Sequence, residues 1–211
     1  MKKEYIKKTK DLIKKLKYIL WEDTSFRGWI ISLIFLFLIV KFVFFPVLHL
    51  ITGTPLSLVI VESCSMYHKG GIFSEFESWW DRNGVKYDVF QITKEDYKRF
   101  PLKNGLDKGD ILFVIKANPQ KLKKGDIIIF EANKENPIIH RIVKIEERDG
   151  KKIFSTLGDN NNGQLFFEKE IDEKIILGKT AFRIVPYFGW IKLIFFEWKK
   201  PLSERGFCVE H

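Results

Sequence analysis

The sequence is poor in the residues that build metal centres and disulfide scaffolds. It has two cysteines, Cys64 and Cys208, and four histidines among 211 residues. Two cysteines exclude a disulfide-rich secreted scaffold and a four-cysteine zinc site, and four histidines argue against a histidine-rich metal cage. Aromatic residues, in contrast, make up 15% of the chain, including 20 phenylalanines. An excess of that size calls for a large core, a membrane contact, or both.

Acidic residues are also in the minority, and the imbalance is local. The chain has 27 Asp and Glu against 36 Lys and Arg, which gives a net charge of +9. Residues 1–27 hold nine of the basic residues and four acids, and so carry +5 of that charge. A nucleic-acid-binding protein would place its basic residues on a folded domain, whereas this cluster directly precedes the most apolar stretch of the chain. We therefore expect a membrane contact and no nucleic-acid partner.

Residues 28–51 form an apolar run of about the length that spans a bilayer as a helix. Lys41 and His49 are its only ionisable side chains. A lysine at the bilayer centre costs about 3 kcal/mol, so we expect Pro46 to loosen or end the helix and Lys41 to reach outward from beyond the midplane. A buried core helix and a cleaved signal peptide are the less favoured alternatives. The run predicts a transmembrane helix.

The positive flank of this run predicts its orientation. Basic residues stay on the cytoplasmic side, so we expect a single-pass protein of the cell membrane with its N-terminus in the cytoplasm and its bulk outside. Within residues 1–27, apolar side chains recur at helical spacing among lysines, which predicts an amphipathic helix on the cytoplasmic membrane surface. A solvated charged helix is the open alternative. The apolar positions are Tyr5, Ile6, Leu12, Ile13, Leu16, Ile19 and Leu20.

Residues 52–185 predict a mostly antiparallel β-domain. The segments are short, rich in Ile, Val and Phe, and separated by Gly, Asn and Pro. The sequence Lys-Gly-Asp-Ile occurs twice, at Lys108–Ile111 and Lys124–Ile127, which indicates one kind of turn used twice to begin a strand. The predicted strands are Leu58–Val61, Ile111–Ile115, Ile127–Phe130, Ile138–Ile145, Lys152–Thr156 and Ile175–Val185.

Two segments depart from this pattern. Residues 70–105 carry many aromatics among charges with poor periodicity, and we interpret them as an insertion with a short helix and irregular structure at the membrane face. Residues 186–211 begin with a very apolar stretch that is too short and interrupted for a second span to be the first choice. We expect a membrane-proximal segment there that lies in the interface.

Three places combine reactive side chains with a suitable setting. Ser65 follows the first strand in Glu62-Ser-Cys-Ser-Met66, His140 lies inside a strand-like run, and Asp159 lies in the turn Gly-Asp-Asn-Asn. A serine needs a base to become a nucleophile, and an imidazole needs a carboxylate to orient it. Each residue alone has an ordinary structural explanation, so the combination is what indicates catalysis.

Together these motifs resemble type I signal peptidases, and most closely the archaeal and endoplasmic-reticulum branch, in which histidine is the general base. The resemblance runs from the apolar run to Val185-Pro-Tyr-Phe-Gly189. It implies a signal-peptidase-like antiparallel β catalytic domain behind an N-terminal transmembrane helix, and a membrane-bound serine endopeptidase that removes signal peptides. It also implies Ser65 as nucleophile and His140 as general base, with Asp159 at the first aspartate of the family. The Ser63 hydroxyl and the Ser65 N–H would form the oxyanion hole.

The chain departs from the family pattern at several positions. Cys64 replaces a glycine between the two serines, and Tyr67-His68 replaces an acid-proline pair. Many relatives have a second aspartate where this chain has Leu165. The orienting acid is therefore Asp159, a nearby acid such as Glu168, or absent. Cys64 as nucleophile and His68 as base are the rival assignments.

The resemblance implies an acyl-enzyme mechanism without a metal or an organic cofactor. The substrate would lie extended along an edge strand, with small side chains in a shallow apolar pocket. The expected partners are preproteins with signal peptides, the lipid bilayer and the translocation machinery. A non-catalytic β-domain that binds extracytoplasmic peptides or partner subunits is the alternative from another class. A serine protease for specific surface proteins, selected through residues 70–105, is the third.

Overall fold

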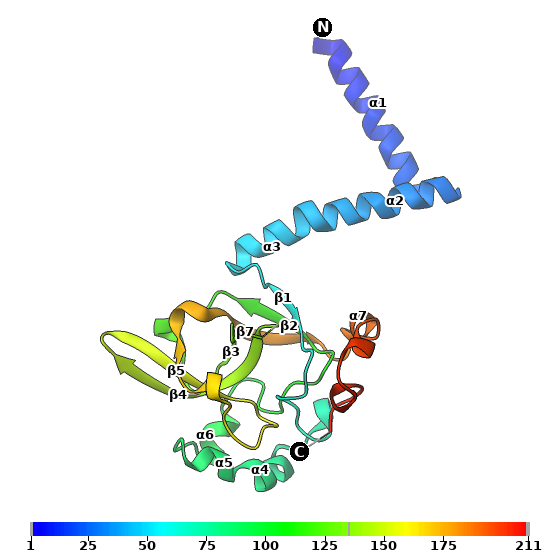
Figure 1. Cartoon of the computed structure of the whole chain (residues 1–211). Coiled ribbons are helices and arrows are strands. Elements are labelled where there is room, and N and C mark those ends of the chain that lie inside the picture. Colours follow the sequence, from blue (N-terminus) through cyan, green and yellow to red (C-terminus); the bar gives the residue numbers. More distant parts are fainter. Residues whose placement is uncertain (1, 135, 210–211) are drawn as a thin grey trace. The chain divides into compact units, whose positions relative to one another are not determined.

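The computed structural model describes residues 2–134 and 136–209 (Figure 1). The chain divides into two compact units, Met1–Ile51 and Thr52–His211.

The N-terminal unit is helical. Helix α1 covers Lys2–Trp21, and helix α2 begins at Phe26, after Ser25, whose hydroxyl accepts a hydrogen bond from the N–H of Gly28 at 3.1 Å. Helix α2 (Phe26–Ile39), a π-helical turn (Val40–Phe44) and α3 (Phe45–Thr52) follow one another without a break. Within the described part of the chain, Phe26–Thr52 is the one helix long and apolar enough to cross a bilayer, and its most apolar stretch is not buried.

The π-helical turn ends two residues before Pro46. Proline has no N–H to donate to the carbonyl four residues earlier, and its ring crowds that carbonyl, so the hydrogen-bonding pattern shifts in this turn. Lys41 lies in the turn, with its ammonium 5.8 Å from the ring centre of Phe37 and 5.4 Å from that of Phe42. Pro46 therefore changes the helix locally and does not end it.

The apolar face expected on α1 is not tested. The side chains of Tyr5, Leu12, Ile13 and Leu16 lie outside the described residues. The amphipathic helix on the membrane surface stays a prediction.

The second unit is built on one seven-stranded antiparallel sheet with the strand order β1-β2-β7-β3-β4-β5-β6. This confirms the predicted fold class. The prediction missed the two-residue strand β6, ended β4 three residues early and made β5 one residue short at each end. The strands are β1 (Leu58–Ile60), β2 (Ile111–Ile115), β3 (Ile127–Phe130), β4 (Ile138–Arg148), β5 (Lys151–Leu157), β6 (Ile171–Asp172) and β7 (Ile176–Val185).

The two Lys-Gly-Asp-Ile segments form the same turn. Gly109 and Gly125 have φ angles of 95° and 91°, in the left-handed region where a glycine is favoured. In both turns the aspartate side chain accepts a hydrogen bond from the N–H three residues earlier, at 2.8 Å for Asp110 and 3.0 Å for Asp126. The strands β2 and β3 therefore start from equivalent turns, as the repeated sequence predicts.

The segment 70–105 is a packed part of the domain. It contains a 3-10 turn (Gly71–Phe73) and the helices α4 (Phe76–Asn83), α5 (Val85–Asp88) and α6 (Lys94–Lys98). Trp79, Tyr87 and Tyr97 are fully buried and form one cluster with Val143 of β4 and Leu157 of β5. The poor periodicity has a physical reason: short helices that bury bulky rings show too few turns for a pattern to emerge. The place of this segment relative to a membrane stays a prediction.

The C-terminal residues form short turns. Helix α7 covers Trp190–Leu193, and 3-10 turns cover Glu197–Lys199 and Leu202–Glu204. Many apolar side chains are exposed here, including Ile191, Phe195 and Trp198. Their contact with a membrane interface remains a prediction. The remaining 3-10 turns are Pro119–Lys121, Phe166–Glu168 and Glu173–Ile175.

Candidate active site

The loop that carries Ser65 follows β1 and is fixed on both sides. The carbonyl of Ser65 accepts a hydrogen bond from the N–H of Asn160 at 2.8 Å, and the carbonyl of Met66 accepts one from Leu106 at 2.7 Å. Met66 is buried in the core beside β2, while Ser65 is half-buried. The hydroxyl of Ser65 therefore lies at the surface of a rigidly held loop.

His140 lies on β4, in register with Ile128 of β3, and its side chain is 3% exposed. Its Nε2 lies 2.8 Å from Oγ of Ser65, and its Nδ1 lies 2.5 Å from Oε1 of Glu168. An ionised carboxylate only accepts hydrogen bonds, so Nδ1 carries the proton and Nε2 is free to accept the proton of Ser65. Two residues predicted from sequence, Ser65 and His140, are thus brought together as expected.

Glu168 is fully buried in the 3-10 turn that precedes β6. Its Oε2 accepts a hydrogen bond from the N–H of Leu165 at 2.7 Å, and its Oε1 accepts one from the hydroxyl of Thr156 at 3.4 Å. These donors and the imidazole supply hydrogen-bond partners for both oxygens of the buried carboxylate. Glu168 was one of the open choices for the acid, and the structure places it against His140.

Asp159 lies in the turn after β5 and has other partners. Arg141 donates to it from Nη2 at 2.7 Å and from Nε at 3.0 Å, and the hydroxyl of Tyr87 donates at 2.9 Å. Burial by itself would raise the pKa of Asp159, but the charge of Arg141 and the hydrogen bonds from His68 and Arg141 hold it below its ordinary value. The Asp159 carboxylate therefore pairs with the buried Arg141. Its position in the family pattern had suggested that it faces His140, and it does not.

His68, the rival base, belongs to the same buried network. Its Nε2 lies 3.1 Å from Oδ2 of Asp159, and its ring stacks on Trp79 with the ring centres 3.7 Å apart. Burial lowers the pKa of His68, while its hydrogen bond to Asp159 opposes that shift. His68 thus packs behind the site as a neutral side chain, and His140 is the imidazole that contacts Ser65.

Cys64, the rival nucleophile, is joined to Cys208 in a disulfide across 144 residues of sequence. Its sulfur is therefore not a thiol and cannot attack a carbonyl in this state. The sequence alone held no signal for this bond, because two cysteines so far apart meet only if the fold brings their Cα atoms within about 7 Å.

Two further features surround the Ser65 hydroxyl. The hydroxyl of Ser63 lies 3.2 Å from it, on the exposed side of the loop. Gly158 approaches so closely that a Cβ atom there would lie 2.8 Å from Nε2 of His140 and 2.8 Å from the carbonyl oxygen of Ser65. Sequence reasoning missed Gly158, although it directly precedes the Asp159 that was singled out.

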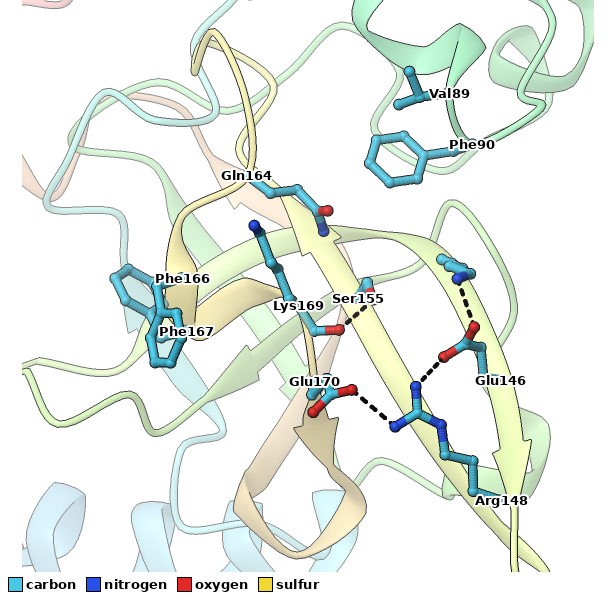
Figure 2. Close-up of a pocket in the computed structure, with 11 residues that line it drawn as sticks. Val89, Phe90, Glu146, Arg148, Ser155, Gln164, Phe166, Phe167, Lys169 and Glu170 are labelled. Carbon is cyan, nitrogen blue, oxygen red and sulfur yellow. Dashed lines mark hydrogen bonds and ion pairs between the residues drawn. The ribbon is translucent and has the colours of Figure 1, made fainter.

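A separate pocket of about 700 Å³ lies over β4 and β5 (Figure 2). Val89 and Phe90 line one side of it, and Gln164, Phe166, Phe167, Lys169 and Glu170 line the other. Arg148 bridges Glu146 and Glu170 at one end of it. Neither Ser65 nor His140 lines this pocket. Among the described residues, no group of three or more His, Cys, Asp or Glu side chains is placed to hold a metal ion.

The site therefore has the arrangement of a serine hydrolase: a serine hydroxyl, an imidazole and a carboxylate joined in one line of hydrogen bonds on an antiparallel β-domain. Such a line is recognised by its geometry and does not depend on the order of its residues along the chain.

The chain is similar to signal peptidases. It is 38% identical over 95 residues to the signal peptidase complex catalytic subunit SEC11 of Lachancea thermotolerans, which covers 41% of this chain and 55% of the relative. It is 32% identical over 104 residues to SEC11C of Homo sapiens, covering 44% and 52%, and 31% identical over 96 residues to SEC11 of Candida dubliniensis, covering 43% and 57%. The chain thus spans about half the length of the curated relatives it matches. No protein-family model matches it. These relatives confirm the resemblance to signal peptidases predicted from the motifs.

Proposed function

We propose that this protein is a membrane-anchored serine endopeptidase that removes N-terminal signal peptides from translocated preproteins. The observation that carries the proposal is the line of hydrogen bonds from Ser65 through His140 to Glu168. The relatives, which are named as catalytic subunits of the signal peptidase complex, support the same activity. No feature of the described residues favours the alternative of a non-catalytic binding domain.

The geometry supports a conventional acyl-transfer sequence. Nε2 of His140 accepts the proton of Ser65 as Oγ attacks the scissile carbonyl. The hydroxyl of Ser63 and the N–H of Ser65 stabilise the oxyanion, and Glu168 stabilises the imidazolium. His140 then gives its proton to the leaving amine. Water attacks the acyl-enzyme with His140 again as base, which frees the new acid and restores the Ser65 hydroxyl.

We assign Glu168 as the acid that orients His140. Asp159 fixes the adjacent turn instead, since its carboxylate is engaged by Arg141, Tyr87 and His68. Asn160, which follows Asp159, donates its N–H to the carbonyl of Ser65. Asp159 is thus a positioning residue that holds the turn against the nucleophile loop.

The proposed topology places the N-terminus in the cytoplasm and the β-domain outside. The basic residues before the apolar helix support this orientation. The Cys64–Cys208 disulfide also supports it, because such bonds persist in oxidising compartments. The substrates would be preproteins, held extended along a sheet edge beside the bilayer. Since the relatives are named as subunits of a complex, partner subunits and the translocation machinery are the proposed protein contacts.

The proposal is tested with the full-length protein in detergent and a model preprotein with small residues at the cleavage site. We expect the wild type to cleave it, and Ser65→Ala and His140→Ala to lose about 10⁴-fold or more in kcat. Ser78→Ala, which changes an exposed serine of α4, is the matched control and should keep full activity. A serine-directed acylating probe should label the wild type at Ser65.

The outcomes separate the three functions. Absence of both cleavage and labelling in a folded wild-type protein would contradict the peptidase and favour the binding domain. Labelling of Ser65 without cleavage of any preprotein would contradict the signal-peptide specificity and favour a protease for other surface proteins.

A further inference from the structure

The Cys64–Cys208 disulfide is attached to the loop that carries the nucleophile, at the residue before Ser65. Cys64 stands between Ser63 and Ser65, the residues assigned to the oxyanion hole and the attack. Its bond to Cys208 connects this loop to the C-terminal segment 197–209, here called the strap. A covalent link at Cys64 restrains the backbone of both Ser63 and Ser65, because each of them is bonded directly to Cys64 in the chain.

The strap is firmly anchored to the domain. The ammonium of Lys108, whose side chain is 1% exposed, donates to Oε2 of Glu197 at 2.7 Å and to the carbonyl of Glu204 at 2.7 Å. It also donates to the carbonyl of Gly206 at 3.2 Å. A buried ammonium with three oxygen partners holds the strap strongly, since a buried charge without partners is unfavourable. The strap can therefore serve as a fixed support.

Asn160 forms a second link parallel to the disulfide. Its Nδ2 donates to the carbonyl of Cys64 at 3.0 Å and to the carbonyl of Val209 at 3.0 Å, and its N–H donates to the carbonyl of Ser65. Asn160 is 2% exposed, so these bonds are shielded from water. One side chain thus joins the strap, the nucleophile loop and the turn after β5.

We infer that the Cys64–Cys208 disulfide and Asn160 position Ser65 and Ser63 for attack, so that reducing the disulfide lowers catalysis while the domain stays folded. The inference rests on the proposed peptidase function. Backbone hydrogen bonds from Asn160 and Leu106 hold the loop of Ser65 after β1, and misplacement of a reacting group by about 1 Å costs about 10²-fold in rate. The disulfide at the adjacent residue adds a covalent restraint to these hydrogen bonds.

The reductive step is balanced by a dithiol reagent. Its thiolate attacks one sulfur of the Cys64–Cys208 bond, and its second thiol closes the reagent's own disulfide. Two electrons and two protons pass to the protein, which leaves two cysteine thiols. A disulfide reagent such as oxidised glutathione reverses the step: it accepts the two electrons and two protons and leaves as two thiols. The peptidase would therefore reach full activity only in an oxidising compartment, where the β-domain is proposed to lie.

The test compares full-length protein in detergent before and after mild reduction with dithiothreitol, which is then removed. We expect kcat for the model preprotein to fall about 10- to 100-fold with KM within about twofold, and to recover after reoxidation. The near-ultraviolet circular dichroism and the melting temperature of the reduced protein establish that it is folded at the assay temperature. Cys64→Ser/Cys208→Ser should show the low kcat permanently and should not respond to dithiothreitol.

Asn160→Ala is a second variant that leaves the disulfide intact. We expect it to lower kcat at constant KM, whereas Asn162→Ala, two residues further on the same turn, should not. An unchanged kcat in the folded, reduced wild type would overturn the inference even if the cysteine variants failed to fold. Failure of the oxidised wild type to cleave the preprotein or to be acylated would instead refute the proposed function.

Discussion

The carboxylate of Glu168 accepts a hydrogen bond from Nδ1 of His140, although 28 residues separate the two in sequence. The pairing joins β4 to a 3-10 turn that begins at Phe166, nine residues after Leu157, the last residue of β5. It fixes the imidazole tautomer that leaves Nε2 able to accept the proton of Ser65. This contact is the basis for proposing Glu168 as the acid of the relay.

The assignment of Glu168 predicts a loss of rate in Glu168→Gln. An amide in place of the carboxylate would favour the wrong tautomer of His140 and would not stabilise its positive form, so we expect kcat to fall about 10³- to 10⁴-fold with little change in KM. Steady-state kinetics on the model preprotein measure this.

Asp159→Asn is the matched comparison. This change leaves Arg141 without a buried counter-charge, and we expect it to lower the free energy of unfolding by about 3–5 kcal/mol. The two assignments would be reversed by the following result: Glu168→Gln is active, while Asp159→Asn is fully stable but as inactive as Ser65→Ala. Asp159 would then be the acid that orients His140.

The close approach of Gly158 predicts that a single methyl group disturbs the site. In Gly158→Ala, the added Cβ would lie within 2.8 Å of both Nε2 of His140 and the carbonyl of Ser65, so the two residues must move apart. We expect kcat to fall about 10²-fold, as a displacement of about 1 Å would produce.

Gly163→Ala controls for the loss of a glycine in the same loop. A Cβ atom at Gly163 meets nothing within 4 Å, so this variant should keep wild-type kcat. Equal activity of both variants would show that the turn at Gly158 adjusts its backbone to accommodate the methyl group without displacing Ser65 or His140.

The buried His68 predicts a dependence of stability on pH. Burial holds its pKa in the folded state below the ordinary 6.5, so between these two values the unfolded chain binds a proton that the folded chain does not. The free energy of unfolding should therefore fall as the pH is lowered through 6.5, and this contribution should be constant above it.

The measurement is the melting temperature of full-length wild type and His68→Asn in detergent, at pH 7.5 and pH 5.5. The variant will be less stable at both values, but its own change between them should be smaller than that of the wild type. An identical change in the two proteins would contradict a depressed pKa of His68.

Lys86 predicts that the 70–105 segment supports the site. The ammonium of Lys86 donates to the carbonyls of Asp159 and Asn161 in the turn that contacts Ser65. Hydrogen bonds from a charged group contribute about 1.5–3 kcal/mol, and we expect Lys86→Met to lose about that much stability and to lower kcat.

Lys86→Arg should recover part of the loss, because it keeps the charge and the donors. Lys121→Met, at an exposed position of a 3-10 turn, is the control and should change neither quantity. If Lys86→Met kept full activity and stability, the prediction that residues 70–105 support the nucleophile loop through Lys86 would be contradicted.

The local elements could be predicted from sequence because their signals are local. The apolar run from Gly28 to Ile51 lies inside one continuous helix. The runs rich in β-branched residues form strands of one antiparallel sheet, which is the predicted fold class. The repeated Lys-Gly-Asp-Ile turns follow from the conformation that each glycine permits. The two-residue β6 could not be predicted, and residues 70–105 gave a prediction of one short helix without bounds, since elements so short show no periodicity.

The sequence alone predicts an apolar helix after a basic flank, an antiparallel β-domain, and a serine and a histidine as candidate partners. Three features depend on the packed fold: the acid that faces His140, the pairing of Asp159 with Arg141, and the bond between Cys64 and Cys208. The reason is physical. Strands and turns depend on neighbouring residues, whereas each of these contacts joins residues between 18 and 144 positions apart, and only the packing of the sheet brings them within bonding distance.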